Sequence, residues 1–403
     1  MRERREALFL AHRMPYPPDK GDKIRSWRLL QRLARHFDVH VAAFVDDPDD
    51  FRHRAVLEGV AASVTLARLD RRFATARSAG GFITGEALSL GYYRDRDMRS
   101  RVAALRARPL AVEVAFSSTM AQYLGLPHGT ASAPRVVDLC DADSEKWRSY
   151  ARRKSFPMSS VYEREGRLLA CAERDIINAA DAAFAVSPAE AAVLQSIDAV
   201  ARVVDWVGNG VDTDYFTPGG ARPADAGGDV VFTGAMDYWA NVDAVSWFAR
   251  EAWPLVRARR PDATFAIVGA RPTLAVEALA AVPGVIVTGR VDDVRPYLLR
   301  AKAAVAPLRV ARGVQNKVLE AMAAGVPVVA TTDAAEGLDA EAGRHYLSAD
   351  EPKDFADAVV GLLGDGGASR KIADAARELV VCSFGWDARL DRFDAVLGRV
   401  GAL

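Results

Sequence analysis

The sequence predicts an α/β protein built from two doubly wound, parallel-sheet domains of the Rossmann-like type. Short apolar runs alternate with stretches long enough for a helix, and a Gly/Pro/Asp-rich segment divides these runs into two sets. The chain length of 403 residues is enough for two domains of about 200 residues, each with its own core. Continuous apolar strands that alternate with helices indicate parallel sheets covered on both faces.

Eleven apolar runs are predicted to be strands. Six lie in the first half: ALFLA (7–11), VHVAAFV (39–45), SVTLARL (63–69), AVEVAFSS (111–118), RVVDLC (135–140) and AAFAVS (182–187). Five lie in the second half: DVVFTGAM (229–236), TFAIVG (264–269), VIVTGR (285–290), AAVAPL (303–308) and VPVVAT (326–331). Helix signals support this division, because Ser187 and Glu190 form a capping box around Pro188 directly after one of the runs.

The densest Gly/Pro/Asp segment, residues 208–228, is predicted to be a linker. It separates an N-terminal domain over residues 1–207 from a C-terminal domain over residues 229–380. Open α/β sheets bind ligands outside the carboxyl ends of their strands. We therefore expect a ligand site at these strand ends, in a cleft between the domains.

The charge balance excludes a dedicated nucleic-acid binder, because Lys plus Arg and Asp plus Glu both number 53. The charges are unevenly spread: residues 1–205 hold 32 basic and 27 acidic side chains, which leaves 53 − 32 = 21 and 53 − 27 = 26 for the rest. Residues 52–108 contain 12 arginines against five acidic side chains. This stretch is either solvated surface or a face for an anionic membrane or a phosphorylated acceptor.

The sequence predicts a cytoplasmic protein, with peripheral contact to the inner face of the plasma membrane left open. Its three cysteines show no C-x-x-C spacing, which fits a reducing compartment and excludes the usual zinc sites. No apolar run approaches the ~20 residues that a membrane-spanning helix needs. The five apolar residues near the N-terminus are too few for a signal-peptide core.

The segment GVQNKVLEAMAAG (313–325) is predicted to be a short helix that binds an anion at its start. Gly313 lets the backbone approach a ligand closely, and Gln315 or Asn316 is a candidate N-cap. Lys317 in the first turn adds positive charge to a helix end that already favours anions. Glu320, one turn further on, is placed to accept hydrogen bonds from sugar hydroxyls. Together they describe a nucleotide site; the alternative is an exposed Lys–Glu pair.

Several motifs resemble the family 4 glycosyltransferases with the two-domain GT-B fold. The segments that carry the resemblance are PYPPDKGDKIRSWRLLQRLA, VGNGVDTDYFTP, FTGAMDYWANVDAVSWF, PDATFAIVGA, VIVTGRVDDVRPYL, APLR and NKVLEAMAAGVPVVAT. Together with DLCDADSEKWRSYA and RGVQNK, they are most similar to the exopolysaccharide sugar transferases associated with bacterial exosortase (PEP-CTERM) systems.

This resemblance implies a donor site in the C-terminal domain. It implies that Arg309 and Lys317 bind the donor diphosphate and that Glu320 binds the ribose hydroxyls. It also implies that backbone around Arg290 and Val291 meets the nucleotide base.

The resemblance also covers the two ends of the chain. Gly21 is expected to let the N-terminal loop approach the donor phosphates. Residues 381–403 are expected to form a helix that crosses back to the N-terminal domain.

The chain departs from the family pattern at two places. Arg312 stands where the family commonly has a carboxylate, and it is expected to meet either an acidic donor sugar or the diphosphate. Residues 238–241, YWAN, stand where the family often has a basic residue. Both departures leave the identity of the donor sugar open.

Two D-x-D triplets invite a metal hypothesis, at Asp141–Asp143 and at Asp212–Asp214. Such triplets arise by chance in a chain with this many acidic residues, and no metal is expected. Asp141 and Asp143 remain candidates for binding acceptor hydroxyls or for a general base, with N-capping of the following helix, for which Ser144 competes, as the alternative. His12, directly after the first strand, is expected near the same edge.

The expected function is therefore transfer of a sugar from a nucleotide diphosphate donor to a lipid-linked or polysaccharide acceptor in exopolysaccharide biosynthesis. The resemblance implies retention of the anomeric configuration. Cationic side chains and helix amides would stabilise the departing diphosphate without a metal. The alternatives are a nucleotide-sugar epimerase on the same scaffold and a non-catalytic partner that binds nucleotide sugars.

Overall fold

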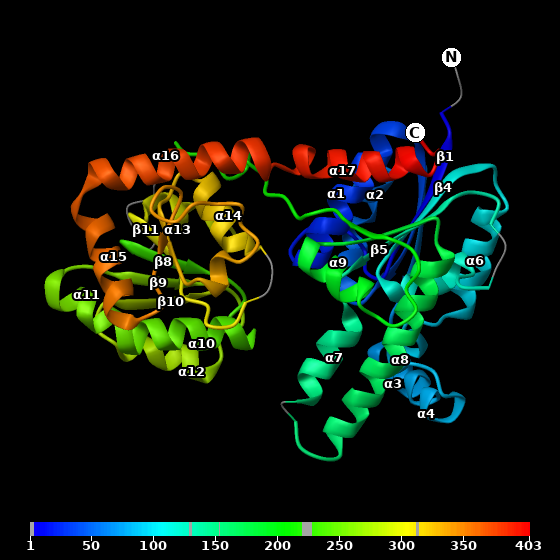
Figure 1. The fold of residues 1–403 in the computed structure, drawn as a ribbon, viewed down its shortest axis with the longest axis horizontal. Coiled ribbons are helices and arrows are strands. Elements are labelled where there is room, and N and C mark those ends of the chain that lie inside the picture. The colour runs from blue at the N-terminus through cyan, green and yellow to red at the C-terminus, as the bar shows by residue number, and fades with distance from the viewer. Residues whose placement is uncertain (1–3, 129–130, 153, 220–227, 312–313) are drawn as a thin grey trace. The chain divides into compact units, whose positions relative to one another are not determined.

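The computed structural model describes residues 4–128, 131–152, 154–219, 228–311 and 314–403. These residues fold into two compact units (Figure 1). Unit 1 consists of Met1–Gly208 and Leu390–Leu403, and unit 2 consists of Asn209–Arg389. The described residues 209–219, which lie in the predicted linker, thus belong to unit 2.

Unit 1 is built on a parallel sheet of seven strands in the order β3-β2-β1-β4-β5-β6-β7. Its strands are β1 (Glu6–Ala11), β2 (Asp38–Val45), β3 (Ser63–Arg68), β4 (Leu110–Phe116), β5 (Arg135–Cys140), β6 (Ala182–Ala185) and β7 (Val204–Trp206). The five apolar residues of β1 are fully buried, as expected for a central strand with helices on both faces.

The helices of unit 1 connect these strands. They are α1 (Gly21–His36), η1 (Pro48–His53), α2 (Arg54–Glu58), α3 (Arg71–Ala79), α4 (Gly81–Thr84), α5 (Leu88–Tyr92), α6 (Arg96–Arg106), η2 (Ser118–Leu124), α7 (Asp143–Ala151), α8 (Met158–Ala179) and α9 (Pro188–Gln195). A buried ion pair fixes α1 on the sheet: Nε of Arg25 lies 2.7 Å from a carboxylate oxygen of Asp138 on β5. Helices α7 and α8 form a hairpin that projects from the sheet (Figure 1).

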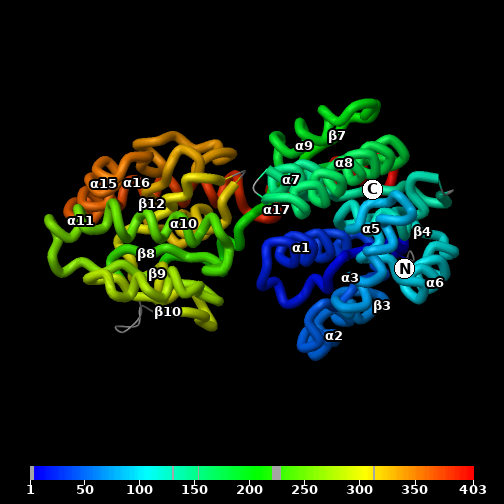
Figure 2. The backbone as a smooth tube through the Cα atoms, turned by 90° about the horizontal axis from the view of Figure 1, so that it is seen from below, coloured from blue at the N-terminus to red at the C-terminus, as the bar shows by residue number. Residues whose placement is uncertain are grey.

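Unit 2 is built on a parallel sheet of six strands in the order β10-β9-β8-β11-β12-β13. Its strands are β8 (Val230–Thr233), β9 (Phe265–Val268), β10 (Val285–Gly289), β11 (Ala303–Ala306), β12 (Val328–Ala330) and β13 (Leu347–Ser348). The other elements of the unit are α10 (Trp239–Trp247), the π-helical turn η3 (Phe248–Ala252), α11 (Trp253–Arg259), α12 (Leu274–Glu277), η4 (Ala278–Ala281), α13 (Arg295–Arg300), α14 (Asn316–Ala323), η5 (Asp333–Ala335), α15 (Pro352–Gly364) and α16 (Gly366–Ser383). Helices α15 and α16 follow one another after the last strand (Figures 1 and 2).

The last helix, α17 (Trp386–Arg399), begins in unit 2 and continues in unit 1. Its first residue, Trp386, is buried against the backbone of Gly210. Further along, Phe393 contacts Phe184 of β6 at a ring distance of 5.7 Å. Arg32 of α1 donates to carboxylates on α17.

The prediction of two doubly wound parallel sheets is confirmed, and each of the eleven predicted runs contains a strand. The sequence did not indicate β7 and β13, which have three and two residues. Such short edge strands form by pairing with a neighbouring strand and leave little apolar periodicity in the sequence. Within the described ranges, no helix is long and apolar enough to span a membrane.

Candidate functional site

Part of the predicted site follows strands that flank the point where each sheet reverses its order, whereas Asp141 and Asp143 follow β5, and Arg290 and Val291 follow β10. This reversal lies between β1 and β4 in unit 1 and between β8 and β11 in unit 2. Doubly wound sheets bind ligands there, outside the carboxyl ends of the strands. His12 follows β1, and Arg309 and α14 follow β11. Each unit is described by itself below.

Helix α14 has its first turn at the carboxyl edge of the unit 2 sheet. The helix stops before Gly325, whose φ of +71° is a left-handed conformation that glycine adopts without strain. Gln315 occupies the N-cap position, but its side chain makes no capping hydrogen bond, so the predicted cap is wrong for this residue. The buried Oδ1 of Asn316 has no hydrogen-bond partner among the described residues, so Asn316 does not supply the cap either. The amides at the start of such a helix lack intrahelical acceptors and favour an anion.

Lys317 points back over the sheet toward the end of β8. Its Nζ donates to Oδ1 of Asn241 on α10 at 2.5 Å and lies 4.3 Å from the centre of the Phe232 ring. Asn241 is itself held, because its Nδ2 donates to the carbonyl of Ala235 at 2.9 Å. The ammonium group therefore has a defined position in the structure.

Two glycines leave room for this arrangement. A Cβ on Gly234 would lie 2.7 Å from Nδ2 of Asn241 and 3.4 Å from Nζ of Lys317. A Cβ on Gly269 would lie 1.6 Å from the carbonyl oxygen of Gly234. A side chain at either position would thus displace the residues that hold the lysine.

Burial shifts the protonation equilibria of the predicted pair in opposite directions. Burial lowers the pKa of Lys317 to about 7, although the charge of Glu320 opposes this shift. Burial also raises the pKa of Glu320 to about 7, although the charge of Lys317 opposes it. Both side chains are partly buried, so the alternative of an exposed Lys–Glu pair is wrong. Shifts of this size are typical of functional sites.

Arg309 lies in the loop after β11 and is bound by a carboxylate in this structure. Its Nε and Nη2 donate to the two oxygens of Asp243 on α10, at 3.1 and 2.5 Å. This hydrogen bond raises the pKa of Arg309 further. The guanidinium is half exposed. An incoming diphosphate would therefore compete with Asp243 for it.

The remaining predicted residues of unit 2 are Arg290, Val291, Arg312 and Gly313. Arg290 follows β10 and is exposed, and Val291 is partly buried against the core of the unit. Both lie at the carboxyl edge, where the resemblance expects the base. Arg312 and Gly313 lie outside the described residues, so their predicted roles stay predictions.

In unit 1, the D-x-D triplet of the N-terminal half lies between β5 and α7. Asp141 is exposed, whereas Asp143 is partly buried and accepts from the Ser118 hydroxyl at 3.4 Å. Burial raises the pKa of Asp143.

The alternative, an N-cap from this triplet or from Ser144, is wrong, because α7 begins at Asp143 after an Ala142 N-cap without a side-chain cap. The Ser144 hydroxyl instead donates to the buried Glu173 at 2.5 Å.

His12 lies at the same edge of unit 1, packed between aromatic rings. Its ring stacks on Phe116 at 5.5 Å and meets Tyr93 edge-on at 5.7 Å. Nε2 lies 3.2 Å from a carboxylate oxygen of Asp22. Although burial opposes the shift, His12 and Arg13 lower the pKa of Asp22.

Gly21, the first residue of α1, has open space around its Cβ position. Within unit 1, the side chain that Gly21 lacks would therefore meet no described neighbour. The predicted approach of this loop to donor phosphates stays a prediction.

Sequence reasoning missed Asn241, Asp243 and Asp22 as partners of the predicted site residues. Asn241 lies in the YWAN segment that departs from the family pattern. This departure was the sequence feature that could have pointed to Asn241 as a site residue. Its contact with Lys317 spans 76 residues, a separation at which local pattern carries no information.

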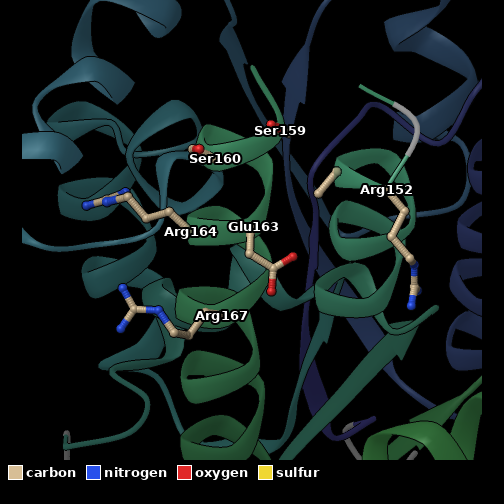
Figure 3. A pocket seen from close by; sticks show the side chains of 7 residues that line it. Arg152, Ser159, Ser160, Glu163, Arg164 and Arg167 are labelled. Carbon is tan, nitrogen blue, oxygen red and sulfur yellow. The ribbon is translucent and has the colours of Figure 1, made fainter. Parts of the chain in front are cut away.

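A cavity of about 530 Å³ lies on the α7–α8 hairpin, away from the predicted residues, and includes Arg152, Ser159, Ser160 and Glu163 (Figure 3). Among the described residues, no group of three or more His, Cys, Asp or Glu side chains is arranged to hold a metal ion.

Comparison with known proteins found one matching family and several similar structures. Residues 227–365 match the family described as glycosyl transferases group 1. Sucrose-phosphate synthase from Thermosynechococcus elongatus is similar in structure, with a TM-score of 0.69 and 18% identity over 99% of this chain and 100% of that chain. HepE from Anabaena, in complex with UDP, has a TM-score of 0.68 and 15% identity over 98% of this chain and 99% of that chain.

A third similar structure is TarM, with a TM-score of 0.64 and 11% identity over 97% of this chain and 98% of that chain. No curated protein matches the sequence. The two parallel sheets and these neighbours establish the GT-B fold, and the match over residues 227–365 identifies the chain as a glycosyltransferase.

Proposed function

We propose that the protein transfers a sugar, with retention of configuration, from a nucleoside diphosphate sugar bound by unit 2 to a lipid-linked or polysaccharide acceptor bound by unit 1. The observation that carries the proposal is the partly buried Lys317, which Asn241 holds beside the first turn of α14. Related structures support the choice of donor, because HepE is described in complex with UDP and with UDP-glucose.

The donor diphosphate supplies negative charge beside Lys317, which the ligand-free site lacks. A lysine at a helix start is unfavourable next to the positive end of the helix dipole, and here burial also disfavours its charged form. A bound diphosphate reverses both effects, since it adds negative charge beside Nζ and the helix amides. Lys317 is therefore expected to take up a proton as the donor binds.

Catalysis follows from the same groups. Negative charge on the diphosphate grows as the bond to the sugar breaks, and preorganised cations and amides stabilise that charge more strongly in the transition state than in the ground state. Lys317 and the α14 amides supply this stabilisation, and Arg309 joins them once the diphosphate replaces Asp243. Glu320 accepts hydrogen bonds from the ribose, and Arg290 and Val291 border the base.

In this proposal, the acceptor binds at the carboxyl edge of the unit 1 sheet. Asp143 and Asp141 offer carboxylate oxygens for acceptor hydroxyls, and His12 lies at the same edge. A variant of TarM from S. aureus is described in complex with Fondaparinux, α-GlcNAc-glycerol and UDP. For this chain we propose membership of glycosyltransferase family 4, a role in exopolysaccharide biosynthesis and a cytoplasmic location, peripheral at the membrane.

A ligand screen followed by a transfer assay tests the proposal. UDP, GDP, dTDP and ADP sugars are added to the full chain, and a true donor at 100 times its Kd raises the free energy of unfolding by about 2.7 kcal/mol. The best donor is then incubated with a bacterial lipid extract or polysaccharide and with no acceptor. Product that requires acceptor supports transfer, whereas a new sugar isomer formed without acceptor supports an epimerase. Stabilisation by no nucleotide sugar would contradict the proposal.

A further inference from the structure

Unit 1 exposes a group of large apolar side chains at the end of the molecule where its strands terminate. Ile83, Phe156 and Phe73 expose 92%, 82% and 74% of their surface. Phe82 and Met158 are also exposed. We call these five residues the apolar tip. Phe73, Phe82 and Ile83 belong to α3 and α4, and Phe156 and Met158 lie where the α7–α8 hairpin turns.

The two segments of the apolar tip are joined by contacts from α8. Nη2 of Arg164 donates to the carbonyl of Gly81 at 2.6 Å, and its guanidinium lies 5.0 Å from the Phe82 ring. The next residue of α8, the buried Glu165, accepts from the backbone amides of Leu88 and Ser89. Figure 1 shows α3, α4 and the hairpin at the same end of unit 1. These contacts from α8 therefore hold the two segments of the apolar tip together.

Basic side chains outnumber acidic ones around the apolar tip. The basic residues on α3, on residues 158–167 of α8 and at the hairpin turn are Arg71, Arg72, Arg77, Arg152, Lys154, Arg164 and Arg167. The acidic residues of the same surface are Asp70, Glu86, Glu145 and Glu163, and Glu86 is paired with Arg94. Asp70 accepts from the first amides of α3, and Glu145 is paired with Arg152. The surface thus combines apolar side chains with a positive surround.

The geometry of these cations favours an extended anionic surface over a single anion. Arg152 and Arg164 both border the 530 Å³ cavity on the hairpin. Figure 3 shows that Arg164 and Arg167 extend from one side of α8, whereas Arg152, directly after α7, lies across from Glu163. Because these arginines diverge, they do not converge on one phosphate. Divergent cations around apolar side chains match a lipid surface, where many headgroups surround an apolar interior.

We propose that unit 1 docks on an anionic membrane, with the apolar tip inserted at the boundary between headgroups and acyl chains and the surrounding basic side chains on lipid phosphates. Helices α3 and α7 both begin at the carboxyl edge of the sheet, where His12 and Asp143 lie. If the acceptor is lipid-linked, which rests on the proposed function, docking in this orientation brings it to that edge without leaving the membrane.

Flotation of the full chain with vesicles tests the docking surface. The vesicles contain phosphatidylcholine alone or phosphatidylcholine mixed with phosphatidylglycerol. The parent is expected to float with the anionic vesicles and to be released by salt. Ile83→Asp and Phe156→Asp are each expected to reduce partitioning about tenfold, because each replaces an inserting apolar side chain by a carboxylate.

Matched controls separate insertion from general effects of charge. Val203 in unit 1 and Leu274 in unit 2 expose 83% and 84% of their surface and lie outside the apolar tip. Val203→Asp and Leu274→Asp are expected to partition like the parent. Equal losses in the control and tip variants would overturn the proposal, as would a parent that floats with neither kind of vesicle or tip variants that float as well as the parent.

A second measurement on the same proteins distinguishes this inference from the proposed function. Thermal unfolding of the full chain is measured with and without UDP-glucose, which is the probe for donor binding to unit 2. The tip variants are expected to keep the shift seen with the parent, and Lys317→Met is expected to lose the shift but still float. Loss of donor binding with intact flotation would leave the membrane inference standing by itself.

Discussion

Replacing Lys317 by Met is expected to stabilise the ligand-free protein while abolishing donor binding. Lys317 keeps its ammonium group in a partly buried position between Asn241 and the Phe232 ring. Methionine has a similar length and no charge, so it removes the desolvation penalty without leaving a large cavity. A residue that is unfavourable for folding but required for binding marks a functional site.

The size of the effect can be worked from the structure. The drop in the pKa of Lys317 from 10.5 to about 7 corresponds to about 5 kcal/mol, at about 1.36 kcal/mol for each pKa unit. The substitution also loses the hydrogen bond to Asn241 and the contact with the ring, which together offset about 2 to 3 kcal/mol. The net gain is about 2 kcal/mol. For a unit of this size, that raises Tm by roughly 4–8 °C.

The assay is thermal unfolding at neutral pH, with and without UDP-glucose. The control is Lys302→Met, which removes an exposed lysine paired with Asp229 in the same unit and is expected to change stability by less than about 1 kcal/mol. A Tm for Lys317→Met at or below that of the parent would show that the ammonium is not held at an energetic cost. A full UDP-glucose shift in Lys317→Met would refute its place in the donor site.

Three further predictions follow from the same site. Asn241→Ala removes the acceptor that positions Lys317, and isothermal titration is expected to show UDP-glucose binding weakened about tenfold; an unchanged Kd would contradict this role. Burial raises the pKa of Glu320 to about 7, so the folded state binds more protons than the unfolded state between about pH 4 and 7. The contribution of Glu320 to stability is therefore complete below this pH window and is lost as the pH rises through it. Guanidinium unfolding across the window is expected to show a flatter pH dependence for Glu320→Gln than for the parent, and parallel curves would rule this out. Transfer activity is expected to survive EDTA, because cationic side chains and helix amides act where a metal otherwise would; loss of activity that magnesium or manganese restores would instead implicate Asp141 and Asp143.

Much of the fold could be predicted because its signals are local. Each predicted strand is a continuous apolar run, and such runs bury on both faces of a parallel sheet. The end of α14 could also be located, since Gly325 and Pro327 stop the helix within the sequence itself. The strands β7 and β13 were missed because pairing with a neighbour, rather than their own pattern, makes them strands.

The candidate site was only partly predictable. The sequence pointed to Lys317 and Glu320 through their spacing on one helix and through a family resemblance. It did not indicate that Asp243 binds Arg309 or that Asp22 binds His12, because those partners come from other elements of the fold. The Ser144 hydroxyl was one alternative for a helix cap, but it donates to Glu173 on the neighbouring helix α8.

By itself, the sequence determined the fold class, the position of helix α14 and the residue types that the proposed donor site needs. These follow from periodicity, helix punctuation and side-chain charge, all of which act over a few residues. Only the tertiary structure decided the protonation of Lys317 and Glu320 and the partners that hold each cation. Those properties depend on burial and on contacts between segments far apart in the chain, such as Asn241 and Lys317, which come together only when the sheet of unit 2 forms.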